Sequence, residues 1–568
     1  MPPRGTPKKA AQTETRSFKD VLMAPSPGAK EPATAPASSS EDDSGVSWKV
    51  FFCLFLTVNL VASMYNHIDD TDETFGYWEP LHYLTYGRGM QTWEYAPQFA
   101  IRTYAFIAPL LPLALLLKRL LLKVEVFHFV RFVLGAQTAY AEATFLRAVQ
   151  AQQGTAAMRL TTIFLLFSPG VLQAATALLP SAVIMSFVML SAAAWLSSQP
   201  LACIWWGCCA VLLTGWPYVG VVFLPMGLHA LHSASRMQGL GGAARLAVGG
   251  LGLACGTALL AALIDRHYYG VWTFPSLNAL RYNAGGSGDN LYGTEPAGYY
   301  VRNLFLTMGL AWPLGAVAPV LLLREYIEPA AQQDRGGKYA GRAARSAVLA
   351  ASAALWLALL FSRPHKEERF MYPIYPLLAY CASVSAVGFV DIVGSVAARL
   401  FRESPPLLVE QDFEELSRIS DIASIPEREG KMSAALQRRR TWGYGIKTAA
   451  MAVCICGSIT LCCLRVASLQ TNYGGYLSMW QDVSNLLPLP PAGKSSPKTH
   501  YTLCVGSEWY RFSSHFHLPE PVSLAFVKDT FGGQLPQVRG VHFGRACHYA
   551  VVRTMHYALC LFGVLCDV

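Results

Sequence analysis

Four carboxylates fall within five positions near the start of the chain, a density that points to proton chemistry. They are Asp69, Asp70, Asp72 and Glu73. Because like charges this close raise one another's pKa, such a run suits the uptake of a proton near neutral pH. Two other interpretations stay open: a solvated helix cap built from Asp and Thr, and a site for a hard cation such as calcium or manganese.

Aromatic and polar side chains alternate directly after the acidic run. The aromatic ones are Phe75, Tyr77, Trp78, Tyr83, Tyr86, Trp93 and Tyr95, and the polar ones are Glu79, His82, Arg88 and Glu94. Aromatic faces beside hydrogen-bonding groups suit sugar rings, and they also suit a membrane interface. We predict sugar contacts from Tyr77, Trp78, His82, Trp93 and Glu94, with Asp70, Glu73 and Glu79 supporting the acidic loop.

A second charged cluster, Arg363–Arg369, interrupts an apolar stretch much later in the chain. A charge at the bilayer centre costs roughly 3 kcal/mol or more, so charges near hydrocarbon tend to be functional, although long basic side chains also snorkel to the interface. Basic groups bind phosphate oxygens by charge-assisted hydrogen bonds. We therefore predict that His365, Lys366 and Arg369 bind a phosphate and that Glu367 and Glu368 orient them.

The elements that must position these clusters are apolar segments. Hydrophobic residues make up 53% of the 568 residues and charged ones only 14%, whereas soluble domains carry about a quarter. Segments near the roughly 20 residues needed to cross a bilayer predict about ten to twelve transmembrane helices. They are Val50–Met64, Ile101–Leu117, Leu160–Leu196, Cys203–Leu231, Leu246–Ile264, Leu304–Leu323, Ala347–Phe361, Tyr372–Val390 and Ile446–Ala467.

The basic residues between these segments predict the orientation. The groups Lys118–Lys123, Arg236–Arg245, Arg324–Arg345 and Arg399–Arg440 are expected in the cytosol. That assignment places residues 65–100, 265–303, 363–369 and the tail from 470 on the opposite side. The middle loop, with its Asn, Tyr and Gly residues, suits either hydroxyl recognition or a generic flexible connection.

Three regions follow from this pattern. Residues 1–47 are predicted to be a disordered cytosolic tail, residues 48–468 a transmembrane catalytic domain, and residues 469–568 a non-cytosolic region. The net charge of +9 is spread beside the spans, which argues against nucleic acid as a partner. Most of the 14 cysteines lie in apolar segments; Cys504 and Cys547 are candidates for a disulfide that sequence alone does not pair. No zinc-ligand spacing is found.

Two motifs together resemble a known enzyme family. The first runs through Asn66-His67-Ile68-Asp69-Asp70, Asp72-Glu73-Thr74-Phe75 and Tyr77-Trp78-Glu79-Pro80-Leu81-His82-Tyr83 to Gln91-Thr92-Trp93-Glu94-Tyr95-Ala96-Pro97, and the second is His365-Lys366-Glu367-Glu368-Arg369-Phe370. Both resemble the dolichyl-phosphate-mannose-dependent α-1,2-mannosyltransferases of N-glycan precursor assembly, glycosyltransferase family 22. The resemblance runs from the first span to about Leu518, and Gly76 departs from the family motif, which carries Asn there.

The resemblance implies an α-helical polytopic membrane protein of the GT-C type, with lumenal amphipathic loop helices and a small lumenal C-terminal region. It implies an active site on the lumenal face of the endoplasmic reticulum membrane. The donor would be dolichyl-phosphate mannose and the acceptor a growing dolichyl-diphosphate oligosaccharide, among the lipids of that membrane. No cofactor would be required, and metal dependence stays open.

A β-linked donor that gives an α-linked product requires inversion, most simply by one displacement through an oxocarbenium-like transition state. Asp72 is the first choice for the base, from the resemblance, and Asp69 the second. The phosphate needs charge stabilisation, which suits the second cluster. The alternatives are a different mannose acceptor, such as another oligosaccharide stage or a GPI-anchor precursor, a polytopic transporter or lipid scramblase, and a noncatalytic assembly subunit.

Overall fold

The structure is a computed structural model that describes most of the chain between residues 46 and 482 and parts of the C-terminal region. The described residues are 46–284, 293–327, 336–400, 449, 452–475, 479–480, 482, 501–506, 514–519, 522–526 and 566–567. The predicted tail, apart from Val46 and Ser47, the basic residues between 401 and 440 and Cys547 lie outside them. The three predicted regions stay predictions.

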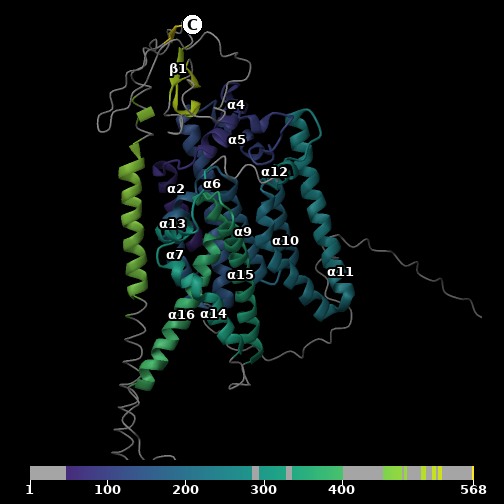
Figure 1. Ribbon diagram of the computed structural model, residues 1–568, viewed down its shortest axis with the longest axis vertical. Coiled ribbons are helices and arrows are strands. Elements are labelled where there is room, and N and C mark those ends of the chain that lie inside the picture. The colour runs from purple at the N-terminus through teal and green to yellow at the C-terminus, as the bar shows by residue number, and fades with distance from the viewer. Residues whose placement is uncertain are drawn as a thin grey trace, which may run out of the picture. The chain divides into compact units, whose positions relative to one another are not determined.

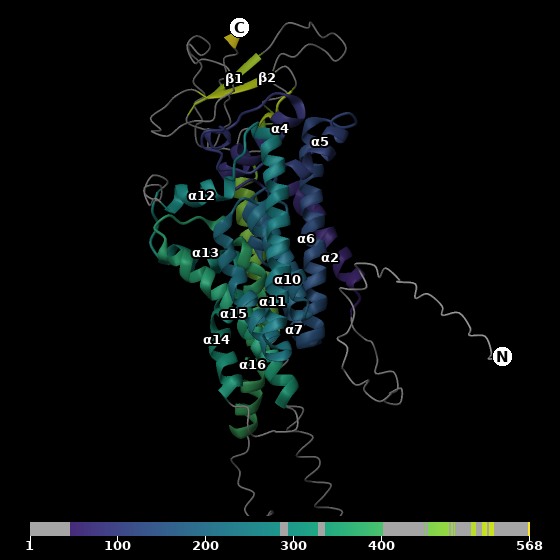
Figure 2. The same cartoon turned by 90° about the vertical axis from the view of Figure 1, so that its right-hand side faces the viewer.

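Long helices make up the body of the chain and lie side by side (Figures 1 and 2). Their bounds are α2 Trp48–Tyr65, α6 Lys123–Gln153, α7 Thr155–Leu166, α8 Pro169–Ala174, α9 Pro180–Leu196, α10 Pro200–Cys208, α11 Gly220–Tyr269, α13 Gly298–Met308, α14 Ala311–Ile327, α15 Gly336–Ser362 and α16 Tyr375–Leu400. Ser47 caps α2 by accepting the N–H of Lys49. Helix α11 is broken at Gly239, whose φ of 68° needs a residue without a side chain.

Five helical segments in the described part are long and apolar enough to cross a bilayer. They are Trp48–Tyr65, Pro217–Tyr269, Ala343–Ser362, Glu368–Phe389 and Ala452–Tyr473. Helices α13 and α14 pass the same test as a pair bent by 109°, and four shorter apolar helices accompany them. The expected helical multi-pass membrane protein is therefore confirmed, while the count of ten to twelve spans stays a prediction.

The predicted span Ile101–Leu117 is not a membrane crossing. Only its second half is helical, as the short helix η3 (Ala108–Leu110) followed by α5 (Leu111–Leu117). Seven residues of α-helix rise about 10 Å, whereas the hydrocarbon core is about 30 Å thick. Residues 101–107 instead extend the first polar loop.

The basic residues after α5 lie at the same end of the bundle as that loop. The loop holds α4 (Glu79–Tyr86), and Lys118 donates a hydrogen bond to the carbonyl of Thr85 in this helix. The ammonium groups of Lys118 and Lys123 lie 5.8 and 5.9 Å from the ring centre of Tyr86. The prediction that this basic group and the first loop lie on opposite sides of the membrane is therefore wrong.

Short helices shape the loops that follow the spans. The first loop contains α3 (Thr71–Glu73), the π-helical turn η1 (Thr74–Trp78), α4 and η2 (Trp93–Tyr95). The other loops contribute α12 (Pro275–Ala284) and η6 (Glu368–Ile374). Gly87, with φ 74°, ends α4 in the left-handed conformation that favours glycine. These short elements carry the polar clusters that the sequence singles out.

The C-terminal region adds a small sheet. Strand β1 (Tyr501–Val505) pairs in parallel with β2 (Val522–Phe526) and antiparallel with β3 (Cys566–Asp567). Alternate residues of β2 are buried, as expected for a strand with one face on a core. Cys504 in β1 is disulfide-bonded. The short helix η8 (His515–His517) packs against α4 and α6.

Candidate active site

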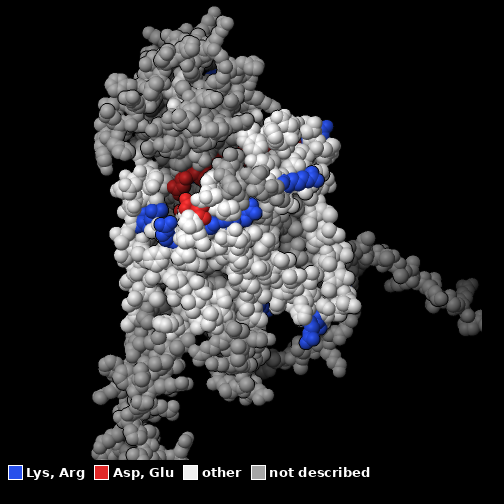
Figure 3. Space-filling view, viewed as in Figure 1, with Lys and Arg blue, Asp and Glu red and all other residues white. Residues whose placement is uncertain are grey.

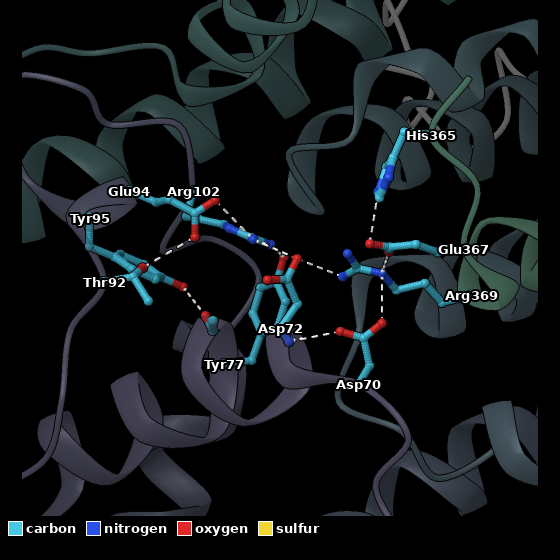
Figure 4. Close-up of polar contacts among 11 residues, drawn as sticks. Asp70, Asp72, Tyr77, Thr92, Glu94, Tyr95, Arg102, His365, Glu367 and Arg369 are labelled. Carbon is cyan, nitrogen blue, oxygen red and sulfur yellow. Dashed lines mark hydrogen bonds and ion pairs between the residues drawn. The ribbon is translucent and has the colours of Figure 1, made fainter. Parts of the chain in front are cut away.

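The acidic loop (residues 69–73) and the cationic loop (residues 363–369) meet where Arg369 contacts Asp72 and Asp70 (Figure 4). Oδ2 of Asp72 accepts hydrogen bonds from Nη1 of Arg369 at 2.7 Å and from Nη2 of Arg102 at 2.8 Å. Asp72 and Arg369 are 297 positions apart in the chain. The expectation that the two clusters face each other at one edge of the bundle is therefore confirmed, although the roles of their residues remain to be tested.

Arg369 lies among three carboxylates. Its Nε donates to Oε2 of Glu367 and forms an ion pair with Oδ2 of Asp70 at 2.9 Å. The other oxygen of Glu367 accepts from Nε2 of His365 at 2.9 Å, and Nδ1 of His365 faces the carbonyl of Gly293 at 2.9 Å. Both ring nitrogens of His365 thus face acceptors, as in an imidazolium. Glu367 thus contacts both His365 and Arg369, and its orienting role stays a prediction.

Arg102 completes the cluster from the opposite side of Asp72. Its Nη2 also bonds Oε1 of Glu94 at 3.0 Å, and its Nη1 donates to the hydroxyl of Tyr77. Thr92 in turn donates to the second oxygen of Glu94 at 3.2 Å. Arg102 was not among the predicted site residues, because it falls in the predicted span Ile101–Leu117. The signal was there, since an arginine inside an apolar segment points to a function.

The C-terminal end of α11 positions Arg102. Asp265 accepts from Oγ1 of Thr103 at 2.8 Å and from the N–H of Tyr104 at 2.7 Å, and the hydroxyl of Tyr269 donates to the carbonyl of Arg102 at 2.6 Å. Ala100, two residues before Arg102, has a φ of 40°, which is costly for a residue with a side chain. The end of α11 thus fixes the backbone of residues 102–104, a structural role that the sequence did not indicate.

The start of the acidic loop is anchored from α6 and α8. Arg131 is buried and donates to the carbonyl of Asn66 at 2.7 Å. The amide of Asn66 donates to the carbonyl of Leu172 and to Thr176. Asp70 then caps α3 by accepting the N–H of Asp72 at 2.7 Å. These bonds fix the backbone that presents Asp72 to the two guanidinium groups.

The two neighbouring aspartates differ in basicity. Burial alone would raise the pKa of Asp72, but the guanidinium groups of Arg102 and Arg369 together hold that pKa well below its usual range. Burial raises the pKa of Asp70, and only Arg369 among its neighbours strongly opposes the rise. With both arginines engaged on it, Asp72 is ionised and a weak base; any gain in basicity has to come from loosening those contacts.

Several predicted site residues lie in the core, away from Asp72. Glu73 is buried and accepts from Nε1 of Trp78 and from the N–H of Leu178, both at 3.0 Å. Trp78 is fully buried, and its ring packs against Phe127 and Phe516. The structure does not bring Trp78 to the place where Asp72 lies. Through these contacts Glu73 and Trp78 support the fold of the loop.

Glu79 and His82 are buried as well. Glu79 accepts from the N–H of His515 at 2.7 Å, from its Nδ1 at 2.7 Å and from the N–H of Met90 at 3.0 Å. Nε2 of His515 accepts the N–H of Leu524, so Nδ1 is the nitrogen that carries the hydrogen. Nδ1 of His82 bonds the carbonyl of Arg88 at 2.7 Å, and burial lowers the pKa of His82 to about 3.

The remaining predicted residues lie near the cluster but bond other partners. Asp69 contacts His67, and Glu368 accepts from the amide of Asn303 at 2.7 Å. The ammonium group of Lys366 donates to the carbonyls of Glu295, at 3.1 Å, and Arg363. Trp93 packs against Phe99 and Tyr282 with ring centres 5.1 and 5.7 Å apart. Of the predicted phosphate ligands, Arg369 is therefore the one that contacts Asp72.

The charged cluster reaches the surface. Figure 3 shows a small acidic patch bordered by basic side chains on an otherwise uncharged face, among the residues drawn in colour. The side chain of Asp72 is 34% exposed, whereas that of Arg369 is 13% exposed. The arginines are thus set into the protein while the carboxylate faces outward.

Breaking the pair of Glu79 and His515 is expected to destabilise the protein. In Glu79→Gln the new amide N–H would face the Nδ1–H of His515, and a buried donor left without an acceptor costs about 1–3 kcal/mol. His515 holds the pKa of Glu79 at about 2 against burial, so this contribution is full above the ordinary value of 4.5 and is lost as the pH falls through 2. Thermal unfolding at neutral pH of the detergent-solubilised chain tests this, with Glu295→Gln as an exposed control. An unchanged midpoint in Glu79→Gln would contradict the assignment.

The pair of His365 and Glu367 is expected to make stability depend on pH. The hydrogen bond to Glu367 raises the pKa of His365 above the ordinary 6.5. Stabilisation from a raised pKa is full below the unfolded value and is lost as the pH rises through the folded one. The gap in unfolding midpoint between the native chain and His365→Gln should therefore be wide at about pH 6 and narrow by about pH 8.5. A gap that widens with rising pH would exclude a charged His365.

Comparisons with known proteins identify the family. The Alg9-like mannosyltransferase family matches residues 50–519. The alpha-1,2-mannosyltransferase ALG9 of Mus musculus is 30% identical over 527 residues, which cover 90% of this chain and 76% of the mouse protein. That of Schizosaccharomyces pombe is 30% identical over 88% of this chain and 79% of its own. A solved structure, ArnT from Cupriavidus metallidurans bound to undecaprenyl phosphate, aligns with a TM-score of 0.48 at 14% identity, covering 84% of this chain and 85% of that one. The chain belongs to the Alg9-like mannosyltransferase family and is a membrane-embedded mannosyltransferase.

Proposed function

We propose that this mannosyltransferase uses dolichyl-phosphate mannose as donor and adds mannose in α-1,2 linkage to a dolichyl-diphosphate oligosaccharide, on the lumenal side of the endoplasmic reticulum. The observation that carries the proposal is the Asp72 carboxylate held between Arg369 and Arg102 at 2.7 and 2.8 Å. It supplies a carboxylate beside two cations, which is what a displacement at a sugar phosphate needs. The α-1,2-mannosyltransferases among its relatives support the linkage.

In this mechanism one bond breaks as another forms. The acceptor hydroxyl attacks C1 of mannose, its proton passes to Asp72, and the bond from C1 to the phosphate oxygen breaks with its electron pair going to the phosphate. Arg369 stabilises the charge that grows on the departing phosphate, and Glu367 and His365 keep Arg369 in place. Base and leaving group act on opposite faces of the sugar, which inverts C1.

A GPI-anchor precursor is the alternative acceptor that has a relative in its favour. The GPI mannosyltransferase 3 of Emericella nidulans is 34% identical to this chain, but over only 142 residues, or 24% of the chain. The ALG9 proteins match most of it, which favours an oligosaccharide acceptor over a GPI-anchor precursor. Transport or scrambling of lipid, the other alternative, has no relative in its favour among these matches.

The test uses the purified full chain with dolichyl-phosphate mannose and a lipid-linked oligosaccharide that lacks its terminal α-1,2 mannoses. The expected product is one mannose larger and is cut back by an α-1,2-specific mannosidase. Matched reactions contain a GPI-anchor precursor as acceptor, or the Asp72→Asn variant. Extension of the GPI precursor alone, or a product that resists the mannosidase, would overturn the proposed acceptor or linkage.

We propose further that transfer needs no metal ion. The carboxylates Asp70, Asp72 and Glu367 that contact Arg369 are already paired with a cation, and the guanidinium groups supply positive charge for the phosphate. The transfer rate of the purified protein should therefore stay within about twofold in excess chelator, because the arginines and not a metal ion would stabilise the charge on the phosphate. A rate that falls in chelator and returns with added manganese or magnesium would show that the acidic loop binds a metal.

A further inference from the structure

The carboxylate of Asp72 occupies a position suited to an anion from outside the protein. Two guanidinium groups, from Arg102 and Arg369, donate to the same oxygen of Asp72. Guanidinium groups bind carboxylates and phosphates with the same donor geometry. A phosphate oxygen between these two side chains would find both donors already in place.

The cluster has more acids than cations. Four carboxylates contact the two guanidinium groups; they are Asp70, Asp72, Glu94 and Glu367. An added phosphate would make the excess of negative charge larger. A phosphate that binds between the arginines therefore competes with a carboxylate for their N–H donors.

Asp72 is the carboxylate most free to leave. Its side chain is 34% exposed, against 19% for Asp70, 17% for Glu94 and 28% for Glu367. Each of the other three has a second bond that holds it: Asp70 caps α3, Glu94 accepts from Thr92, and Glu367 accepts from His365. In the described part of the chain, the contacts of Asp72 run through Oδ2 to the arginines.

Arg102 is open to a ligand and would stay in place when Asp72 leaves. Gly76 adds no side chain over its guanidinium group: a Cβ at that position would lie 3.5 Å from Cζ. Tyr77 and Glu94 hold the guanidinium, and Tyr269 bonds the backbone carbonyl of Arg102. The cation is therefore anchored independently of Asp72.

We propose that Arg102 and Arg369 together bind the phosphate of the lipid-linked sugar donor, and that Asp72 fills this site until the donor displaces it. The inference rests on the proposed function and adds Arg102 to its machinery. A lipid-linked acceptor also carries phosphate, but that diphosphate lies at the far end of the oligosaccharide from the hydroxyl that reacts. The phosphate beside Asp72 is therefore the one on the reacting sugar.

The exchange couples donor binding to activation of the base. While the site is empty, the two arginines hold Asp72 ionised and weakly basic. Once they bind the phosphate, Asp72 is released, its basicity rises, and it can take the proton of the acceptor hydroxyl. The enzyme would thus acquire its base only after the leaving group is bound.

The test measures the affinity of the purified full chain for dolichyl phosphate, which lacks the sugar and does not react. Arg102→Ala and the charge-preserving Arg102→Lys should weaken binding by about tenfold, the loss expected for charge-assisted hydrogen bonds. Asp72→Asn should bind at least about threefold more tightly, because the competing anion is gone. A gain in affinity cannot come from misfolding. Arg281→Ala and Glu295→Gln, which alter exposed charges in the neighbouring loop, serve as controls and should leave binding unchanged.

Two results would overturn the inference: Asp72→Asn binding no tighter than the native chain, or Arg102→Lys and Arg102→Ala binding as well as the native chain. Tighter binding of a dolichyl-diphosphate oligosaccharide than of dolichyl phosphate, lost in Arg102→Ala, would assign the site to the acceptor instead. Each of these can occur while the native chain transfers mannose. If the native chain transferred no mannose, the proposed function itself would be wrong.

Discussion

Asp72→Asn is expected to abolish mannose transfer while the protein still inserts and still binds dolichyl phosphate. Loss of a positioned general base lowers rates by roughly a hundredfold to ten-thousandfold. Asn keeps the shape of the side chain but cannot accept the proton, so the fall should appear in kcat. Initial rates of the purified variant with dolichyl-phosphate mannose and a lipid-linked oligosaccharide measure it.

The matched control is Asp69→Asn, which removes a carboxylate three positions away. Asp69 contacts His67 in the same loop, whereas Asp72 contacts the arginines of two other segments. We therefore expect a smaller loss of rate in Asp69→Asn. Near-normal rates in Asp72→Asn together with a large loss in Asp69→Asn would move the role of base to Asp69.

Some of this site could be predicted from local sequence alone. The acidic run and the Arg363–Arg369 cluster stand out because charge is rare in an apolar chain. Their meeting follows from topology, since both were placed at the same end of the spans. Glu367 was also predicted to orient its neighbours, because a carboxylate between cations has few other roles.

The misses have a common physical cause, which is that apolar composition does not distinguish a span from a buried loop. Residues 101–117 are apolar enough to suggest a crossing, yet their first half is a loop that carries Arg102. The error also placed Lys118 on the wrong side, because basic residues that follow a predicted span were assigned to the cytosol. Packing between distant segments decides such cases, and a single sequence does not show it.

The burial of Glu79 and Trp78 illustrates a second limit. Both residues lie in an aromatic and polar stretch that suits a sugar site or a membrane interface. In the structure, η8 covers them: His515 bonds Glu79, and Phe516 packs against Trp78. His515 is 436 positions away from Glu79, so no local pattern could indicate this contact.

Arg369→Ala is expected to impair use of the donor far more than use of the acceptor. Truncating one partner of a buried charge pair costs about 2–5 kcal/mol, so kcat/KM for dolichyl-phosphate mannose should fall by roughly thirtyfold or more. Arg369 bonds Asp70, Asp72 and Glu367, so the variant leaves three carboxylates with one cation fewer. The KM for the oligosaccharide should change little, because its reacting hydroxyl meets Asp72 and not the arginine.

Arg369→Lys separates the charge of this residue from its geometry. Lysine keeps the positive charge but presents a single ammonium group, whereas the guanidinium of Arg369 reaches Asp70 through Nε and Asp72 through Nη1 at once. The lysine variant should therefore recover only part of the donor affinity lost in Arg369→Ala. Full recovery would mean that charge alone suffices, and a change confined to the KM of the acceptor would show that Arg369 does not bind the donor phosphate. If donor use fails in both variants while dolichyl phosphate still binds normally, the arginine acts on the transition state alone.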